Sequence, residues 1–173
     1  MKKFLIKIDT YMDVDDTDWL LLDALQQDTS QSNQALAERV HVSPPTALRR
    51  ARRLREAGLI ASQVALLDED RIAALQGHGL TAIAEVSLDH QGAEHLDAFE
   101  RRAVQDTAVR QCYRVAPGPD FVLLLRVPDM PAYQALAERL FTQDANVRNV
   151  RVFFSVKRAK FETRIPLARS LRG

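Results

Sequence analysis

Residues 32–60 read SNQALAERVHVSPPTALRRARRLREAGLI, and they predict two helices joined by a tight turn. Ser32 or Asn33 can cap the first helix. Ser43 and Pro44 mark the start of the second, because proline suits the first helical position, where no N–H is needed. His41 stands in the turn where glycine is favoured, so we expect it to be left-handed. The predicted inward residues are Leu36, Ala37 and Val40 on the first helix and Ala47, Ala51 and Leu54 on the second, with Gly58 ending it.

A third helix precedes this pair. Leucines and Trp19 recur at helical spacing after Asp15 and Asp16, which can cap the helix and favour its N-terminal dipole. Helix, short helix, turn and longer helix is the helix-turn-helix arrangement, whose last helix enters the major groove of DNA. About 45 residues form a small unit, so we expect it to be stabilised by the second half of the chain or by another subunit.

Charge is unevenly distributed along the chain, although 24 Lys and Arg residues nearly balance 23 Asp and Glu residues. Residues 13–28 contain six aspartates and no basic residue, whereas residues 43–57 contain five arginines and one glutamate. A solvated helix face is the simplest explanation of such a run. However, Thr46, Arg49, Arg50 and Arg53 recur at i, i+3, i+4 and i+7 and predict one outward strip, and arginine can bind phosphate or guanine. We therefore expect DNA contacts from Ser43, Pro45, Thr46, Arg49, Arg50 and Arg53.

The second half of the chain alternates between strand and helix patterns. After a strand or extended hinge at residues 59–67, strands are expected at 80–88, 109–115, 121–127 and 150–156, with helices at 93–104 and 131–141. The order β-α-β-β-α-β predicts a ferredoxin-like antiparallel sheet with both helices on one face. The open face should then meet a second copy in a homodimer.

The fold class expected is therefore α+β, with an N-terminal helix-turn-helix domain, possibly winged, and a C-terminal ferredoxin-like domain. We divide the chain into an N-terminal extension (1–12), the helix-turn-helix domain (13–60), a hinge strand and linker (61–78) and the ferredoxin-like domain (79–173).

Several classes of protein and site are disfavoured. Neither a signal peptide nor a membrane span of roughly 20 apolar residues is visible. The single cysteine, Cys112, cannot form an internal disulfide and fits the cytoplasm. His90 and His95 do not share a helix face, and no phosphate loop, paired-carboxylate motif or nucleophile elbow is present. We expect no metal, no cofactor and no catalytic residue.

Several short motifs resemble the leucine-responsive regulator and AsnC (Lrp/AsnC) family of bacterial and archaeal transcription factors. They include Asp15-Asp16-Thr17-Asp18, Leu36-Ala37-Glu38-Arg39-Val40, Ser43-Pro44-Pro45-Thr46, Glu56-Ala57-Gly58-Leu59-Ile60, Cys112-Tyr113-Arg114-Val115 and Arg126-Val127-Pro128-Asp129-Met130. The resemblance covers nearly everything after about Val14. It implies a hinge strand between the two domains, dimers that build into tetramers or octamers, and an amino-acid effector bound near the turn between the second and third strands of the effector domain.

The chain departs from the family at that turn. Pro117 stands where the family usually has glycine, with Gly118 one place later and the family's aspartate kept as Asp120. A carboxylate can pair with an ammonium group, and turn N–H groups can bind a carboxylate, but each proline lacks that donor. Gly118 and Asp120 are the candidate effector contacts. The alternatives are a different effector, no effector, and an Asp120 that only satisfies its own turn.

Three functions follow. The leading one is a sequence-specific transcriptional regulator that binds double-stranded DNA and is modulated by an amino acid or related metabolite. The second is an architectural DNA-bundling protein without an effector. The third, a small enzyme on the ferredoxin-like domain, rests on fold analogy alone.

Overall fold

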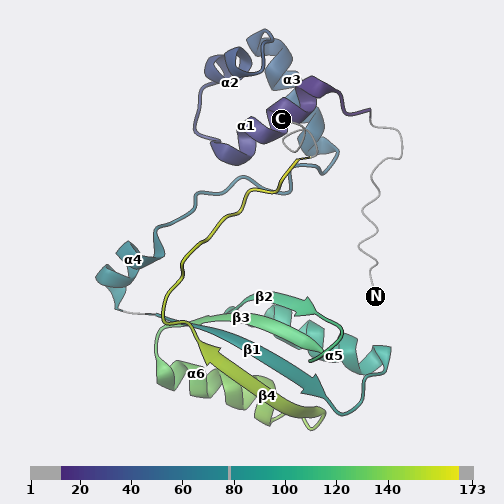
Figure 1. Cartoon of the computed structure of the whole chain (residues 1–173), viewed down its shortest axis with the longest axis vertical. Coiled ribbons are helices and arrows are strands. Elements are labelled where there is room, and N and C mark those ends of the chain that lie inside the picture. Colours follow the sequence, from purple (N-terminus) through teal and green to yellow (C-terminus); the bar gives the residue numbers. More distant parts are fainter. Residues whose placement is uncertain (1–12, 78, 168–173) are drawn as a thin grey trace. The chain divides into compact units, whose positions relative to one another are not determined.

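The computed structural model describes residues 13–77 and 79–167, and the chain in it divides into two compact units (Figure 1). The sheet unit holds Leu67–Ala159. The head unit is described through residues 13–66 and 160–167. The extension predicted at residues 1–12 lies outside the described residues. Residues 160–167 group with the head unit, whereas the sequence division placed them in the ferredoxin-like domain.

The head unit is built from α1 (Asp16–Gln27), α2 (Asn33–Arg39) and α3 (Pro44–Glu56). Asp15 caps α1 and Ser32 caps α2, each by accepting a backbone N–H bond. His41 has a φ of 57°, so the predicted left-handed turn is confirmed. No strand occurs in the described part of this unit, and the helix-turn-helix is therefore plain there rather than winged. The predicted inward residues are all buried: Leu36, Ala37, Val40, Ala47, Ala51 and Leu54.

The connector between the helices and the sheet differs from the prediction. Residues 61–68 form no strand, and the unpredicted helix α4 (Glu69–Gln76) follows them. A strand needs a neighbour for its N–H and C=O groups, and no described strand pairs with this segment. Its apolar side chains are correspondingly exposed: Val64 by 69%, Leu66 by 63% and Leu67 by 71%.

The sheet unit is a four-stranded antiparallel sheet. Its strands are β1 (Leu80–Leu88), β2 (Val109–Arg114), β3 (Phe121–Val127) and β4 (Val147–Phe154), in the order β2-β3-β1-β4. Helix α5 (Ala93–Gln105) joins β1 to β2, and α6 (Met130–Ala137) with one π-helical turn (Glu138–Thr142) joins β3 to β4. This confirms the predicted ferredoxin-like order, with β3 and β1 at the centre of the sheet.

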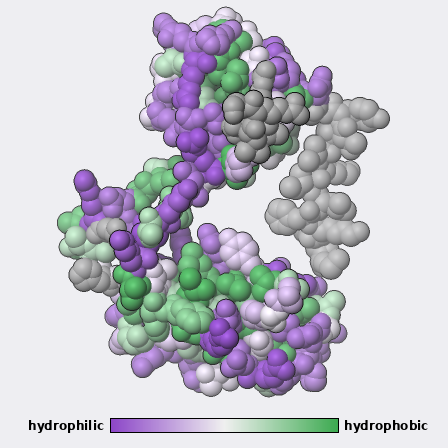
Figure 2. Space-filling view, in the orientation of Figure 1, coloured by the Kyte–Doolittle hydropathy of each residue, from purple (hydrophilic) through white to green (hydrophobic). Residues whose placement is uncertain are grey.

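The two faces of the sheet differ in burial. On one face, alternate residues of β1 and β3 are buried against Phe99 of α5 and Leu136 of α6. On the other, Ile83 is 42%, Tyr113 53% and Phe153 49% exposed, and Figure 2 shows hydrophobic surface gathered over the strands. Val156, predicted in the last strand, lies beyond the end of β4 and is fully exposed.

Candidate nucleic-acid interface and effector turn

Helix α3 is held by its apolar side. Ala47 and Leu54 are completely buried and pack in one cluster with Leu21 and Ala24 of α1. The small side chain of Ala47 lets the helices approach closely, so the opposite side of α3 is left at the surface. Gly58, with a φ of 76°, turns the chain after the helix, as a glycine readily can.

The first turns of α3 are open to solvent. Ser43, Pro45 and Arg49 are exposed, and Thr46 is half-buried. The hydroxyl oxygens of Ser43 and Thr46 lie 2.8 Å apart, so the predicted capping hydroxyl of Ser43 bonds a side chain rather than a backbone N–H. Arg49 forms no ion pair within the part of the chain that the structure describes. These four residues therefore combine hydroxyl groups and one available guanidinium at one end of the helix.

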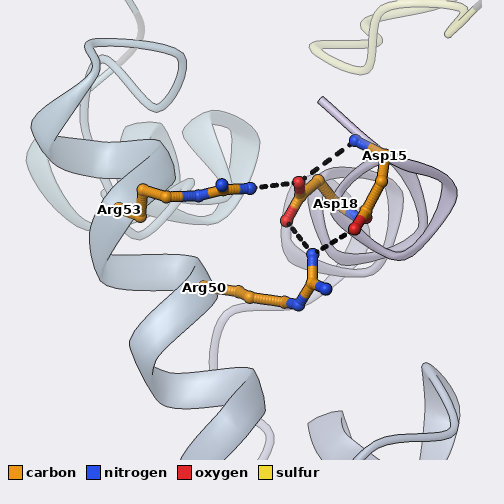
Figure 3. Close-up of polar contacts among 4 residues, drawn as sticks. All are labelled: Asp15, Asp18, Arg50 and Arg53. Atoms are coloured by element: carbon orange, nitrogen blue, oxygen red, sulfur yellow. Dashed lines mark hydrogen bonds and ion pairs between the residues drawn. The ribbon is translucent and has the colours of Figure 1, made fainter. Parts of the chain in front are cut away.

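Arg50 and Arg53 do not project outward with Arg49, which corrects the predicted strip. Arg50 Nη1 donates to Asp15 Oδ2 at 2.7 Å and to Asp18 Oδ1 at 3.0 Å, and Arg53 Nη2 donates to Asp18 Oδ2 (Figure 3). Asp18 is fully buried, so both of its oxygens require donors. The Nε atoms of both arginines are buried without a partner among the described residues. Both side chains are therefore turned towards the start of α1.

The ion-pair cluster also shifts pKa values. The Asp15 pKa is lowered, chiefly because its carboxylate accepts the Asp18 backbone N–H and then because it accepts a bond from Arg50. The Arg50 pKa is raised by the bonds to Asp15 and Asp18. Asp15 and Asp18 additionally form a capping box, each accepting the other's backbone N–H. The cluster thus joins the N-terminal end of α1 to the middle of α3.

Arg52 is an exposed cation that the sequence prediction omitted. Its side chain is 75% exposed, and among the described residues its one ion pair is with Glu56 on its own helix, at 2.7 Å. Because Pro45, Arg49 and Arg52 follow one another at i, i+4 and i+7, they share one face. The helical spacing of the buried residues was the sequence signal that could have indicated Arg52 as an exposed residue of α3. Measured from Ala47, Ala51 and Leu54, Arg49 lies nearly opposite, and Arg50 lies at the flank. Arg52 and Arg53 lie about equally far from the buried side, so the spacing indicates Arg52 but does not indicate that Arg53 is withdrawn.

The predicted effector residues lie between β2 and β3. Gly118 is exposed with a φ of 125°. Asp120 is half-buried: its Oδ2 accepts the Leu88 backbone N–H at 2.7 Å, and its own N–H donates to the Val86 carbonyl at 2.8 Å. At least one carboxylate oxygen of Asp120 therefore extends the pairing of β3 with β1.

The described residues contain no group of three His, Cys, Asp or Glu side chains placed to hold a metal. None of the helices described is both long and apolar enough to cross a bilayer.

Comparison with known proteins agrees with this geometry. Residues 14–55 match the AsnC-type helix-turn-helix domain, and residues 81–165 match the Lrp/AsnC ligand binding domain. A leucine-responsive regulatory protein of Rhizobium meliloti is 34% identical over 86% of this chain and 93% of its own length. The Bkd operon transcriptional regulator of Pseudomonas aeruginosa is 32% identical over 90% of this chain and 99% of its own. A Neisseria meningitidis transcriptional regulator crystallised with L-Met superposes with a TM-score of 0.80 at 27% identity, covering 91% and 99% of the two chains.

Proposed function

The chain belongs to the Lrp/AsnC family of transcriptional regulators, and from this premise we propose that it binds specific double-stranded DNA sites through α3 and responds to an amino acid or a related small metabolite. The observation that carries the proposal is the open N-terminal half of α3, where Ser43, Pro45, Thr46 and Arg49 face solvent wholly or in part. This role is regulatory rather than catalytic. Binding to the chromosome would place the protein in the cytoplasm.

The residues of α3 have two different roles in the proposed DNA binding. Arg49 is exposed and has no carboxylate partner in the described residues, so it can bind guanine or phosphate, while the first-turn hydroxyls suit phosphate oxygens. Arg52 extends this face by one turn. Arg50 and Arg53 are occupied by Asp18, and they act on DNA binding by holding α3 in place.

The regulator is proposed to work as a homodimer that builds into a tetramer or octamer. The apolar open face of the sheet supports this assembly, because a monomer would leave Ile83, Tyr113 and Phe153 in water. Closed pairing of two copies also places two α3 helices on one DNA molecule, as cooperative binding to two half-sites requires.

We propose that the effector binds to Asp120 and Gly118 in the turn between β2 and β3. One oxygen of Asp120 is used by Leu88, and Pro117 and Pro119 supply no N–H donors, so an amino acid would rely on the remaining oxygen and on Gly118. The L-Met complex of the Neisseria regulator favours an amino acid. The internal bond of Asp120 favours the second candidate, an architectural DNA-binding protein without an effector.

The DNA proposal is tested by selecting a binding site from random duplexes and measuring affinity by fluorescence anisotropy. Arg49→Ala is expected to weaken specific binding by about 5- to 150-fold, the equivalent of 1–3 kcal/mol for a base contact. The matched control is Arg71→Ala, an exposed arginine of α4 paired with Asp68, which should stay within about twofold of wild type. Equal affinity for selected and random duplexes at every salt concentration would reject sequence-specific regulation.

The effector proposal is tested by thermal shift with the twenty amino acids, since a ligand of the folded state raises Tm. Asp120→Asn should abolish the shift. A wild-type protein with no shift for any amino acid would favour the architectural function.

A further inference from the structure

The end of the chain returns to the helix-turn-helix. Residues 160–167 group with the head unit although they directly follow the sheet unit. Two hydrogen bonds anchor the segment: Gln26 Nε2 donates to the Ile165 carbonyl at 3.0 Å, and the Ile165 N–H donates to Gln26 Oε1 at 3.0 Å. The two residues are 139 positions apart in sequence. The head unit is therefore connected to the sheet unit at both ends of the sheet unit's sequence.

The amide of Gln26 pairs with Ile165 as one strand residue pairs with another. One donor and one acceptor on the side chain satisfy one acceptor and one donor on the backbone. A further bond from Gln26 Nε2 to Asp23 Oδ1 at 3.2 Å helps to orient the amide. The side chain of Ile165 remains 65% exposed, so the contact depends on backbone groups.

The segment and α1 also carry opposite net charge in the sequence. Between residues 157 and 164 the segment carries Lys157, Arg158, Lys160 and Arg164 against Glu162, whereas residues 13–28 around α1 carry six aspartates and no cation. Opposite charges within a Debye length of about 8–10 Å attract each other across a surface. Within the acidic stretch Asp15 and Asp18 are paired with Arg50 and Arg53, so the opposite net charges of the two stretches are an addition to the Gln26–Ile165 contact and do not replace it.

The other end of the segment is also held. Arg158 Nη1 donates to Glu69 Oε2 at 2.9 Å, which ties the chain beyond β4 to the first turn of α4. Ile165 is six positions after Ala159, so this second connection spans at most about 20 Å when fully extended.

We infer that residues 160–167 form a strap that binds to the Gln26 side of α1. Binding of this strap restricts the movement of the head unit. The inference rests on the proposed function in one respect: in a dimer on DNA, restricted heads accept only a narrow range of half-site spacings. A freely moving head would tolerate a wider range of half-site spacings. At the spacing that suits the restricted dimer, the effective concentration of the second head at its half-site would be lower.

Docking itself is measured by amide hydrogen exchange of Ile165 in the full-length chain. Gln26→Ala is expected to accelerate this exchange by about tenfold, because it removes the acceptor of the Ile165 N–H. The control is Gln34→Ala on α2, whose amide donates to Glu38 on the same helix, and it should leave Ile165 protected. Exchange at Ile165 that is equal in wild type and Gln26→Ala would overturn the strap.

The role in DNA binding is measured with duplexes whose two half-sites are moved apart by about half a helical turn. Wild type should lose at least about tenfold in affinity, whereas Gln26→Ala and Ile165→Pro, which lacks the N–H donor, should lose about threefold or less. Ile165→Ala keeps the backbone bonds and should behave as wild type, and single half-site affinity should not change in any variant. Equal spacing dependence in all four proteins would overturn the restricting role. A wild-type chain that binds no DNA would refute the proposed function, while the exchange measurement still decides docking.

Discussion

Replacing Asp18 by asparagine should destabilise the head unit selectively. Asp18 is fully buried and accepts bonds from Arg50, Arg53 and the Asp15 backbone N–H. An asparagine of the same shape carries only one carbonyl oxygen, and its NH₂ group would face donors. The substitution therefore removes the negative charge and at least one bond from an interior position.

The magnitude follows from these bonds. A hydrogen bond to a charged group contributes about 1.5–3 kcal/mol and a neutral one about 0.5–1.5 kcal/mol. Removing one partner of a fully buried ion pair costs about 3–5 kcal/mol. The side chains of Arg50 and Arg53 are 21% and 42% exposed, so water compensates them in part. We expect a loss of about 2–3 kcal/mol in the free energy of unfolding.

Urea denaturation followed by tryptophan fluorescence measures this loss, because the protein's one tryptophan, Trp19, lies in α1 beside Asp18. The matched control is Asp13→Asn, an exposed carboxylate just before the helix, for which the expected change is within about 0.5 kcal/mol. A change of that small size for Asp18→Asn would show that the cluster does not hold α3 and would refute the reasoning.

Three further predictions concern single side chains. If Arg49 binds phosphate, Arg49→Ala should reduce the slope of the logarithm of the DNA-binding constant against log salt concentration by about one. Arg50→Ala should leave this slope unchanged and lower the stability of the protein. A reduced slope for Arg50→Ala would show that Arg50 contacts DNA directly. The Asp106 pKa lies below its ordinary 3.8 because its carboxylate accepts a bond from Arg139, so this pair stabilises the fold above about pH 4 and the contribution disappears as pH falls through the lowered value. Asp106→Asn should accordingly flatten the acid-side fall of the urea midpoint, and an unchanged profile would contradict the pairing. Burial raises the pKa of the Cys112 thiol, so alkylation by iodoacetamide at pH 8 should be several-fold slower in the native protein than in urea, and equal rates would contradict its burial.

Local sequence patterns predicted much of the secondary structure and the burial. The inward faces of α2 and α3, the alternation along β1 and the left-handed His41 each depend on a periodicity or a turn residue that operates over a few positions. The strand order followed from the element order, because few topologies satisfy β-α-β-β-α-β.

The connector and the strap could not be predicted in this way. The segment at 61–68 contains strand-forming residues, but a strand forms only where another segment supplies hydrogen bonds. The bond between Gln26 and Ile165 joins residues at opposite ends of the chain, and neither residue type signals it.

The arginines of α3 show which properties of the candidate site arise from local sequence and which arise from tertiary structure. The sequence by itself determined that α3 would be a basic helix after a tight turn, with one apolar side buried, because those properties arise from neighbouring residues. Only the tertiary structure decided that Arg50 and Arg53 bind Asp18 while Arg49 stays available. That outcome depends on a buried carboxylate more than thirty residues away, whose desolvation must be compensated by whichever cations the packing of α1 on α3 brings within reach.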